Sequence, residues 1–261
     1  AWRLEQLNGQ LLLGHNKGLF QITDHSLKPV RQGIGTWKLL PLSMVYPVKE
    51  SLIGTYNGLE LLDFNQGLFL IKGPLDGPSD SFRFLEQDEK GTIWASHPYR
   101  GIYRITLSDD KKSYQAKLCN HKDGLPADYQ NYVFKIKNQV VFATEKGLYR
   151  YDYKINRFLP AEQFVAFKDL TIRYLKDDQE GNVWFCTRKM VGVGRFDSKL
   201  RTYHLINFPE IEGMNTTGFE HIYTIDQHNI YIGAEKGLIH INYDKYLKDS
   251  VRPVAMLSQI I

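Results

Sequence analysis

One pattern recurs six times along this chain of 261 residues. In each copy a short apolar strand ends in a small residue, a few polar residues follow, and a glycine begins a second strand. The marker glycines are Gly18, Gly58, Gly101, Gly147, Gly194 and Gly237. Successive glycines lie 40 to 47 residues apart, which matches the ~40–50-residue period of four-stranded propeller blades. A unit of this length buries its faces only by stacking on its neighbours, so the repeat predicts a ring of blades.

The residues around each glycine favour antiparallel strands. The segments 93–96 and 141–144 are short, β-branched and aromatic, and the turns at 88–92 and 178–182 each contain a glycine. We expect innermost strands at 132–136 and 172–175, and outer strands at 157–158 and 202–205. Apolar residues do not keep helical spacing over about a dozen residues, so we expect little helix beyond one or two turns within 161–170. The sequence therefore predicts an all-β protein, a β-propeller of four-stranded antiparallel blades.

Composition excludes several classes of protein. The chain is 43% hydrophobic and 24% charged, which is ordinary for a globular domain, and it has no run of about 18 apolar residues that could span a membrane. The net charge of +4 comes without a basic stripe, which argues against a nucleic-acid partner. The two cysteines, Cys119 and Cys186, lack metal-ligand spacing. We expect them to be buried, and their spacing leaves a disulfide between them open.

The chain carries no recognisable catalytic constellation. Its eight histidines are scattered, and it has neither a nucleophile elbow nor a dinucleotide fingerprint. The adjacent acids at 109–110 and 177–178 would point to opposite faces of a strand. The repeat loops offer only Glu145 and Glu235 as acids. We therefore predict no catalysis, no cofactor and no metal in this chain.

The loops between the second and third strands of each repeat gather on one face of a propeller, where ligands often bind. The third repeat has the longest of these polar loops apart from the expanded fifth, and it combines His97, Tyr99 and Arg100. A tyrosine ring can stack on a sugar, and an arginine can hold a carboxylate or sulfate. The candidate ligand-binding residues are His97, Tyr99, Arg100, Tyr56, Arg188 and Lys189. The simpler interpretation of these loops is a set of solvated hairpin turns.

The tryptophans divide into two kinds. Trp94 and Trp184 recur at the same place in the repeat, so we expect them to pack between blades. Trp37 lies outside the motif, and its burial is left open.

Several repeats share a longer motif, Asp/Asn-x-x-Gly-x-Ile/Val-Trp-x-x-Thr/Ser-x-x-Gly-Leu-Tyr-Arg-Tyr-Asp, best matched at 88–105, 138–152 and 178–197. Residues 121–126 add an Asp-Gly-Leu-Pro segment that leads into the next repeat. This pattern resembles the two-component regulator propeller repeat, and the resemblance covers about residues 2–242. The first two repeats lack the Tyr-Arg-Tyr-Asp ending.

The resemblance implies the periplasmic sensor portion of a hybrid two-component histidine kinase. Such sensors carry seven-bladed propellers followed by an Ig-like Tyr-rich domain. On this basis residues 1–245 form the propeller, and 246–261 form a linker and the first strand of that Ig-like domain. The first residues of the chain do not resemble a natural start, which indicates one slice of a longer protein. With six motifs, the ring of blades could close in two ways. Either the two ends of the chain combine into one blade and close a six-bladed ring, or a seventh blade lies upstream of residue 1.

The implied function is extracytoplasmic recognition of polysaccharide-derived oligosaccharides. The implied partners are an oligosaccharide ligand and a second copy of the ectodomain in a homodimer, with membrane contact only through the rest of the chain. Two alternatives remain: a passive protein-interaction propeller, and a glycan-active propeller enzyme.

Overall fold

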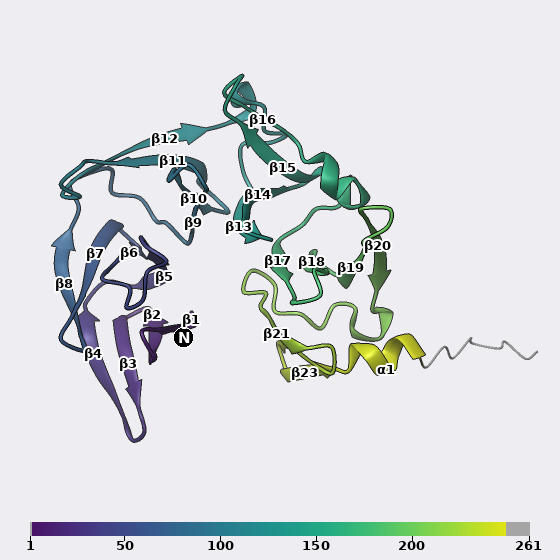
Figure 1. Ribbon diagram of the computed structural model, residues 1–261, viewed down its shortest axis with the longest axis horizontal. Helices are drawn as coiled ribbons and strands as arrows, with labels where there is room; N and C mark the ends of the chain where they lie inside the picture. Colours follow the sequence, from purple (N-terminus) through teal and green to yellow (C-terminus); the bar gives the residue numbers. More distant parts are fainter. Residues whose placement is uncertain (1, 249–261) are drawn as a thin grey trace, which may run out of the picture.

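The computed structural model describes residues 2–248, which form six antiparallel sheets arranged as blades around a central axis (Figure 1). Blade 1 consists of β1 (Arg3–Leu7), β2 (Gln10–His15), β3 (Gly18–Thr23) and β4 (Ser26–Gln32). Blade 2 consists of β5 (Thr36–Pro41), β6 (Glu50–Thr55), β7 (Gly58–Asn65) and β8 (Leu68–Pro74). Blade 3 consists of β9 (Phe84–Gln87), β10 (Ile93–His97), β11 (Gly101–Leu107) and β12 (Tyr114–Cys119).

The second half of the ring repeats this plan. Blade 4 consists of β13 (Tyr132–Ile136), β14 (Gln139–Thr144), β15 (Gly147–Asp152) and β16 (Arg157–Pro160). Blade 5 consists of β17 (Tyr174–Asp177), β18 (Val183–Cys186), β19 (Val191–Asp197) and β20 (Thr202–Asn207). Blade 6 has three strands within residues 2–248: β21 (Ile222–Asp226), β22 (Asn229–Ala234) and β23 (Gly237–Ile241). Residues 2–248 thus form a β-propeller of six blades, which confirms the predicted fold class.

Helical structure is confined to short segments of the described chain. Three 3₁₀ turns lie between strands, and one α-helix follows blade 6: η1 (His121–Asp123), η2 (Glu162–Phe167), η3 (Pro209–Ile211) and α1 (Tyr243–Lys248). The expected helical turns within 161–170 correspond to η2. The expected innermost strand at 132–136 is β13, whereas the one expected at 172–175 begins two residues later, at Tyr174.

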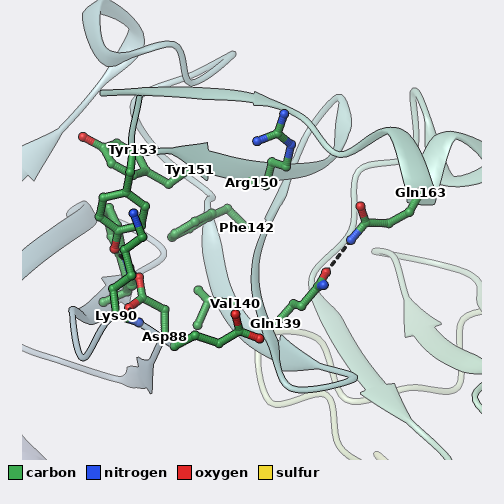
Figure 2. Close-up of a pocket in the computed structure, with 11 residues that line it drawn as sticks. Asp88, Lys90, Gln139, Val140, Phe142, Arg150, Tyr151, Tyr153 and Gln163 are labelled. Atoms are coloured by element: carbon green, nitrogen blue, oxygen red, sulfur yellow. Dashed lines mark hydrogen bonds between the residues drawn. The ribbon is translucent and has the colours of Figure 1, made fainter. Parts of the chain in front are cut away.

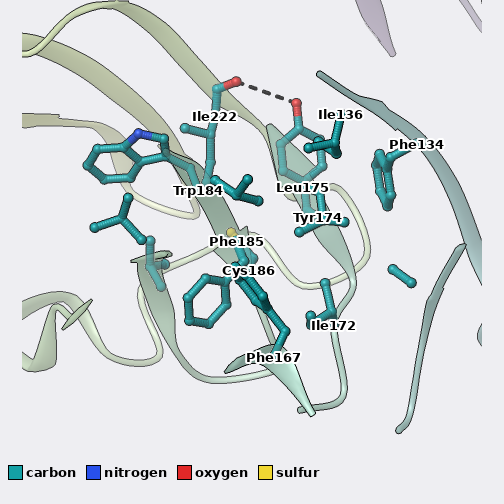
Figure 3. Close-up of a cluster of buried hydrophobic side chains, with 14 of the residues drawn as sticks. Phe134, Ile136, Phe167, Ile172, Tyr174, Leu175, Trp184, Phe185, Cys186 and Ile222 are labelled. Atoms are coloured by element: carbon teal, nitrogen blue, oxygen red, sulfur yellow. Dashed lines mark hydrogen bonds between the residues drawn. The ribbon is translucent and has the colours of Figure 1, made fainter. Parts of the chain in front are cut away.

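The recurring tryptophans pack as predicted. Trp94 and Trp184 have no exposed surface. Trp184 lies in the largest hydrophobic cluster, which joins β13 of blade 4, β17 and β18 of blade 5 and β21 of blade 6 (Figure 3). Each blade thus contributes one face to the core that it shares with its neighbour.

The repeated aspartate explains the spacing of the motif. In blade 3, Asp88 accepts hydrogen bonds from the main-chain N–H of Thr92 (3.0 Å) and from the indole N–H of Trp94 (2.9 Å). In blade 5, Asp178 accepts the same pair from Asn182 (2.8 Å) and Trp184 (3.0 Å). One carboxylate therefore closes the first hairpin turn of the blade and supplies the buried tryptophan with its acceptor.

Both cysteines are buried and carry free thiols, so the disulfide that the spacing left open is not formed. Burial raises the pKa of Cys119 to about 11 and raises the pKa of Cys186 still further. The two residues behave as small hydrophobic side chains.

The ends of the described chain do not share a blade, since β1 pairs within blade 1 and β21–β23 form blade 6. These two blades flank the opening in the ring seen in Figure 1. Each keeps an exposed apolar face: Leu4, Leu11 and Leu27 in blade 1, and Tyr223, Ile225 and Leu238 in blade 6. A seventh blade therefore stays a prediction. So does the strand of an Ig-like domain within 246–261, because residues 249–261 lie outside the described part of the chain.

Candidate functional site

The innermost strands of the blades begin at the same end of the propeller axis, and an unusual set of side chains gathers there. Trp2 precedes β1, Trp37 is the second residue of β5, Arg83 precedes β9, and Arg173 precedes β17. Phe219 lies in the segment that enters β21. Together with Arg3, Phe84, Tyr174, Glu220 and His221, these residues line a cleft of about 60 Å³, hereafter the axial cleft. Five of the six blades thus contribute to one site.

A continuous row of aromatic rings forms one side of the axial cleft. Trp2 stacks on Phe219 with ring centroids 5.2 Å apart, and lies 5.2 Å from Trp37. Trp37 in turn lies 4.8 Å from Tyr56, in the β6–β7 turn. Phe219 is 45% exposed, so the row ends in a ring that solvent can reach. Rings stacked in this way present their edges and the free face of an end ring, and a sugar can stack against such a face.

Gly35 makes room for the Tyr56 ring, at the end of the row opposite Phe219. A Cβ atom at residue 35 would lie only 2.4 Å from Cζ of Tyr56, and the main-chain N–H of Tyr56 donates to the carbonyl of Gly35 (3.1 Å). The tyrosine ring is therefore held between a glycine and Trp37. The two glycines at 33 and 35 are part of this local packing and not of a nucleotide-binding loop.

Arg83 lies among the rings. Its guanidinium carbon is 4.5 Å from the ring centre of Phe219, 5.3 Å from Trp37 and 5.3 Å from Phe84. It donates a hydrogen bond to the carbonyl of Gly218, but none of the described carboxylates comes within 4 Å of it. Burial lowers its pKa, although an arginine still carries its charge at neutral pH. The cleft thus holds a partly buried cation without an ion-pair partner.

The segment before β9 connects the axial cleft to the loop of blade 3. The indole N–H of Trp37 donates to the hydroxyl of Ser81 (2.9 Å). The neighbouring Asp80 accepts a hydrogen bond from the Tyr103 hydroxyl, and its carboxylate lies 3.7 Å from Nε of Arg100. The predicted site residue Arg100, which is largely exposed, is thus in ion-pair range of the residue next to Ser81, the acceptor of the Trp37 indole N–H.

His97 and Tyr99 lie on the same loop. Their rings are 5.7 Å apart, and the Tyr99 ring is exposed. Partial burial, together with the charge of Arg83, lowers the pKa of His97, so this imidazole is neutral at pH 7. Of the six residues predicted from the sequence, Tyr56 contacts Trp37, and His97, Tyr99 and Arg100 lie on the neighbouring loop of blade 3. These four are not among the residues that line the axial cleft.

Arg188 and Lys189 do not join the other four. Both are exposed in the connection between β18 and β19 of blade 5, where the Lys189 carbonyl accepts a hydrogen bond from Gly213 (2.8 Å). Sequence reasoning also missed Trp2, Arg83, Arg173 and Phe219. One signal was available: residues 83–85 read Arg-Phe-Leu and residues 173–175 read Arg-Tyr-Leu, so an arginine stands at the entrance of two innermost strands.

A larger groove of about 350 Å³ lies between blades 3 and 4, on the side of the β9–β10 and β13–β14 turns (Figure 2). Its polar groups are largely paired with one another. Tyr153 donates to Asp88, and Gln163 donates to Gln139 (2.6 Å). Asp88 and Trp94 belong to the structural motif of the blade. In this groove Lys90 is exposed to solvent and Arg150 pairs with Asp152, whereas the unpaired Arg83 of the axial cleft is partly buried among aromatic rings. We therefore place the candidate ligand site at the axial cleft.

Residues 2–248 contain no group of three or more histidine, cysteine, aspartate or glutamate side chains placed to hold a metal ion. Within the same residues, none of the helices has the length and apolar character needed to cross a membrane.

Solved structures with the same fold include sensor ectodomains. The extracellular domain of a hybrid two-component system from B. thetaiotaomicron matches with a TM-score of 0.65 and 16% identity, over 97% of this chain and 36% of that one. PorZ, a surface component of the type-IX secretion system of Porphyromonas gingivalis, matches with a TM-score of 0.62 and 12% identity, over 93% of this chain and 40% of that one. A virginiamycin B lyase from Staphylococcus aureus matches with a TM-score of 0.53 and 11% identity, over 90% of this chain and 81% of that one.

Identities this low show the shared propeller fold and no more. The ectodomains belong to the group of proteins that the repeat motif resembles, and the chain spans about a third of their length, 35% to 36%. Neither a protein-family model nor a curated protein matches the sequence.

Proposed function

We propose that this chain is part of the extracytoplasmic, periplasmic sensor of a hybrid two-component signalling protein, and that its axial cleft binds an oligosaccharide. The repeat motif and the fold shared with two-component ectodomains support the sensor role. The observation that carries the ligand proposal is the row of four rings, Trp2, Trp37, Tyr56 and Phe219.

The position of the axial cleft suits a signalling role. Trp2 of blade 1 stacks on Phe219 of blade 6, so the cleft includes a contact between the two blades that flank the opening of the ring. A sugar lying on these rings would contact both blades at once. A ligand shifts a conformational equilibrium only if it binds the two states with different affinities. A site shared by two blades binds its ligand differently in the two states when the spacing of the blades differs between them. In a homodimeric ectodomain such a change would alter how the two copies meet.

Calorimetric titration of the intact ectodomain with a panel of plant and host oligosaccharides tests the proposal. We expect at least one to bind, and Trp37→Ala to weaken that binding about tenfold or more, because an aromatic contact in a binding site contributes roughly 1–2 kcal/mol. Tyr99→Ala weakens it less, since its exposed ring lies on the neighbouring loop of blade 3 and not in the lining of the cleft. Tyr46→Ala is the matched control, because Tyr46 is also exposed but lies in the β5–β6 turn on the opposite face.

A folded ectodomain that binds none of the panel contradicts the ligand proposal and favours a protein-interaction propeller. Turnover of a glycan by the purified protein would instead favour an enzyme.

A further inference from the structure

The charges in the axial cleft indicate which oligosaccharides it selects. Three arginines from alternate blades line it: Arg3 of blade 1, Arg83 before blade 3 and Arg173 before blade 5. His221, in the same lining, is neutral at pH 7, because partial burial of its ring and the nearby charges of Arg3 and Lys176 lower its pKa to about 4. The nearby carboxylates are too few to give each of these arginines an ion-pair partner.

The nearby glutamates are already engaged. Glu86, whose charge also acts on Arg3, pairs with Lys38 (2.8 Å). Glu5 lies 2.5 Å from Nε of Arg3 and also accepts the main-chain N–H of Leu39. Glu220 lies 3.9 Å from Nη1 of Arg173 and accepts the N–H of Gly218. Arg83 has the carbonyl of Gly218 as its acceptor and no carboxylate within 4 Å among residues 2–248. The cleft therefore carries one uncompensated positive charge.

Three further donors in the lining are buried without a hydrogen-bond partner: the indole N–H of Trp2 and the Nε–H groups of Arg3 and Arg173. Arg3 Nε lies 2.5 Å from the Glu5 carboxylate, which leaves Trp2 and Arg173 as the donors open to a ligand. A buried donor without a partner is costly, and most such groups in proteins are satisfied. Unpaired donors and an unpaired cation in one cleft are complementary to a single group: a small anion that accepts several hydrogen bonds at once.

We propose that the axial cleft binds the carboxylate or sulfate group of an acidic oligosaccharide, with Arg83 as its main ligand and Arg173 and Trp2 as further donors. The cleft of about 60 Å³ has room for a group of a few atoms, since one water needs roughly 10–15 Å³ by the same kind of measure. The sugar ring that bears the group lies on the aromatic row, with Phe219 and Trp37 on either side of the arginine. This inference rests on the proposed function and specifies its ligand class.

The test compares acidic oligosaccharides with neutral counterparts that have the same backbone. The probes are oligogalacturonides against their carboxyl-reduced forms, and chondroitin sulfate oligosaccharides against their desulfated and carboxyl-reduced forms. Titration of the intact ectodomain should show that an acidic member binds at least about tenfold more tightly than its neutral counterpart, as expected for hydrogen bonds to a charged group. The two probe families distinguish a carboxylate from a sulfate.

Variants of Arg83 assign the effect to the cleft. Arg83→Met should remove the preference for the acidic member, and Arg83→Lys should restore part of it, because lysine keeps the charge but not the paired donors. Arg150→Met is the control, since Arg150 pairs with Asp152 on the opposite face and should leave the affinity unchanged. Far-ultraviolet circular dichroism confirms that each variant is folded.

The outcomes separate this inference from the proposed function. If neutral oligosaccharides bind as tightly as acidic ones and Trp37→Ala weakens both, the sensor proposal stands and the anion inference is wrong. If an acidic member binds but Arg83→Met leaves its affinity unchanged, the anion lies elsewhere and the inference is again wrong. If no member of either series binds the folded ectodomain but another oligosaccharide of the panel does, the anion inference is wrong and the proposed function stands. If nothing in the panel binds, both proposals are contradicted.

Discussion

Gly35 offers the most direct test of how the aromatic row is held. An alanine at residue 35 would place its Cβ 2.4 to 2.7 Å from three atoms of the Tyr56 ring, well inside contact distance. The backbone of residue 35 is not left-handed, so alanine causes no backbone strain and its effect comes from the ring alone. Gly35→Ala is therefore a probe of one contact in the candidate site.

The size of the effect follows from the two ways in which the ring can respond. If it stays, the overpacking costs about 1–3 kcal/mol. If it swings away, the contact with Trp37 is lost, at about 0.5–1.5 kcal/mol. A domain of this size loses roughly 2–4 °C in Tm per kcal/mol. We therefore expect Tm to fall by roughly 1–12 °C, with a loss of oligosaccharide affinity similar to that of Tyr56→Ala.

Thermal and urea unfolding of a double-mutant cycle provides the assay. In a Tyr56→Ala background, Gly35→Ala should cost nothing, or stabilise by about 0.4–1 kcal/mol through the unfolded chain. Gly233→Ala is the control, because the nearest atom to a Cβ there is 3.9 Å away and the change should be tolerated. An equal cost of Gly35→Ala in both backgrounds would refute the clash with Tyr56.

Two further predictions concern the blade motif and the thiols. Asp178→Ala removes the acceptor of the buried Trp184 indole N–H and of the Asn182 main-chain N–H. Because an unsatisfied buried donor costs about 1–3 kcal/mol, Tm should fall by roughly 2–12 °C. Asp109→Ala, at an exposed acid, should leave Tm unchanged, and equal Tm values for the two variants would contradict the proposed role of the motif. Cys119 and Cys186 should both resist a thiol reagent in the native protein, because burial and the raised pKa of each thiol keep it protonated. Unfolding in guanidinium should release two reactive thiols, whereas a count of zero without reductant would indicate a disulfide.

Much of the fold could be predicted from the sequence, because the determinants of a blade are local. The glycine of each second hairpin, the strand before it and the Asp…Trp pair all act within one repeat. In Asp88 and Trp94, six residues apart, the hydrogen bond that orients the tryptophan is encoded in the spacing itself. The period then specifies stacking, since blades of this kind bury their faces only against one another.

The candidate site was predictable only in part. His97, Tyr99 and Arg100 are close in sequence, and the loop that carries them could be recognised as polar and long. Tyr56 was expected on the same face, but nothing local indicates that its ring rests on Gly35 and Trp37. Arg188 and Lys189 resemble the other loop residues in type, and only the positions of the blades around the axis separate them from the cluster.

The sequence by itself therefore determined the blades, their number in this chain and the face that carries the loops. The tertiary structure alone decided that Trp2 meets Phe219, more than 200 residues away, and that Arg83 lies between rings from blades 2 and 6 without a carboxylate partner. The physical reason is that these contacts form where innermost strands from separate repeats converge on one axis. Which side chains meet there depends on ring closure, which no single repeat encodes.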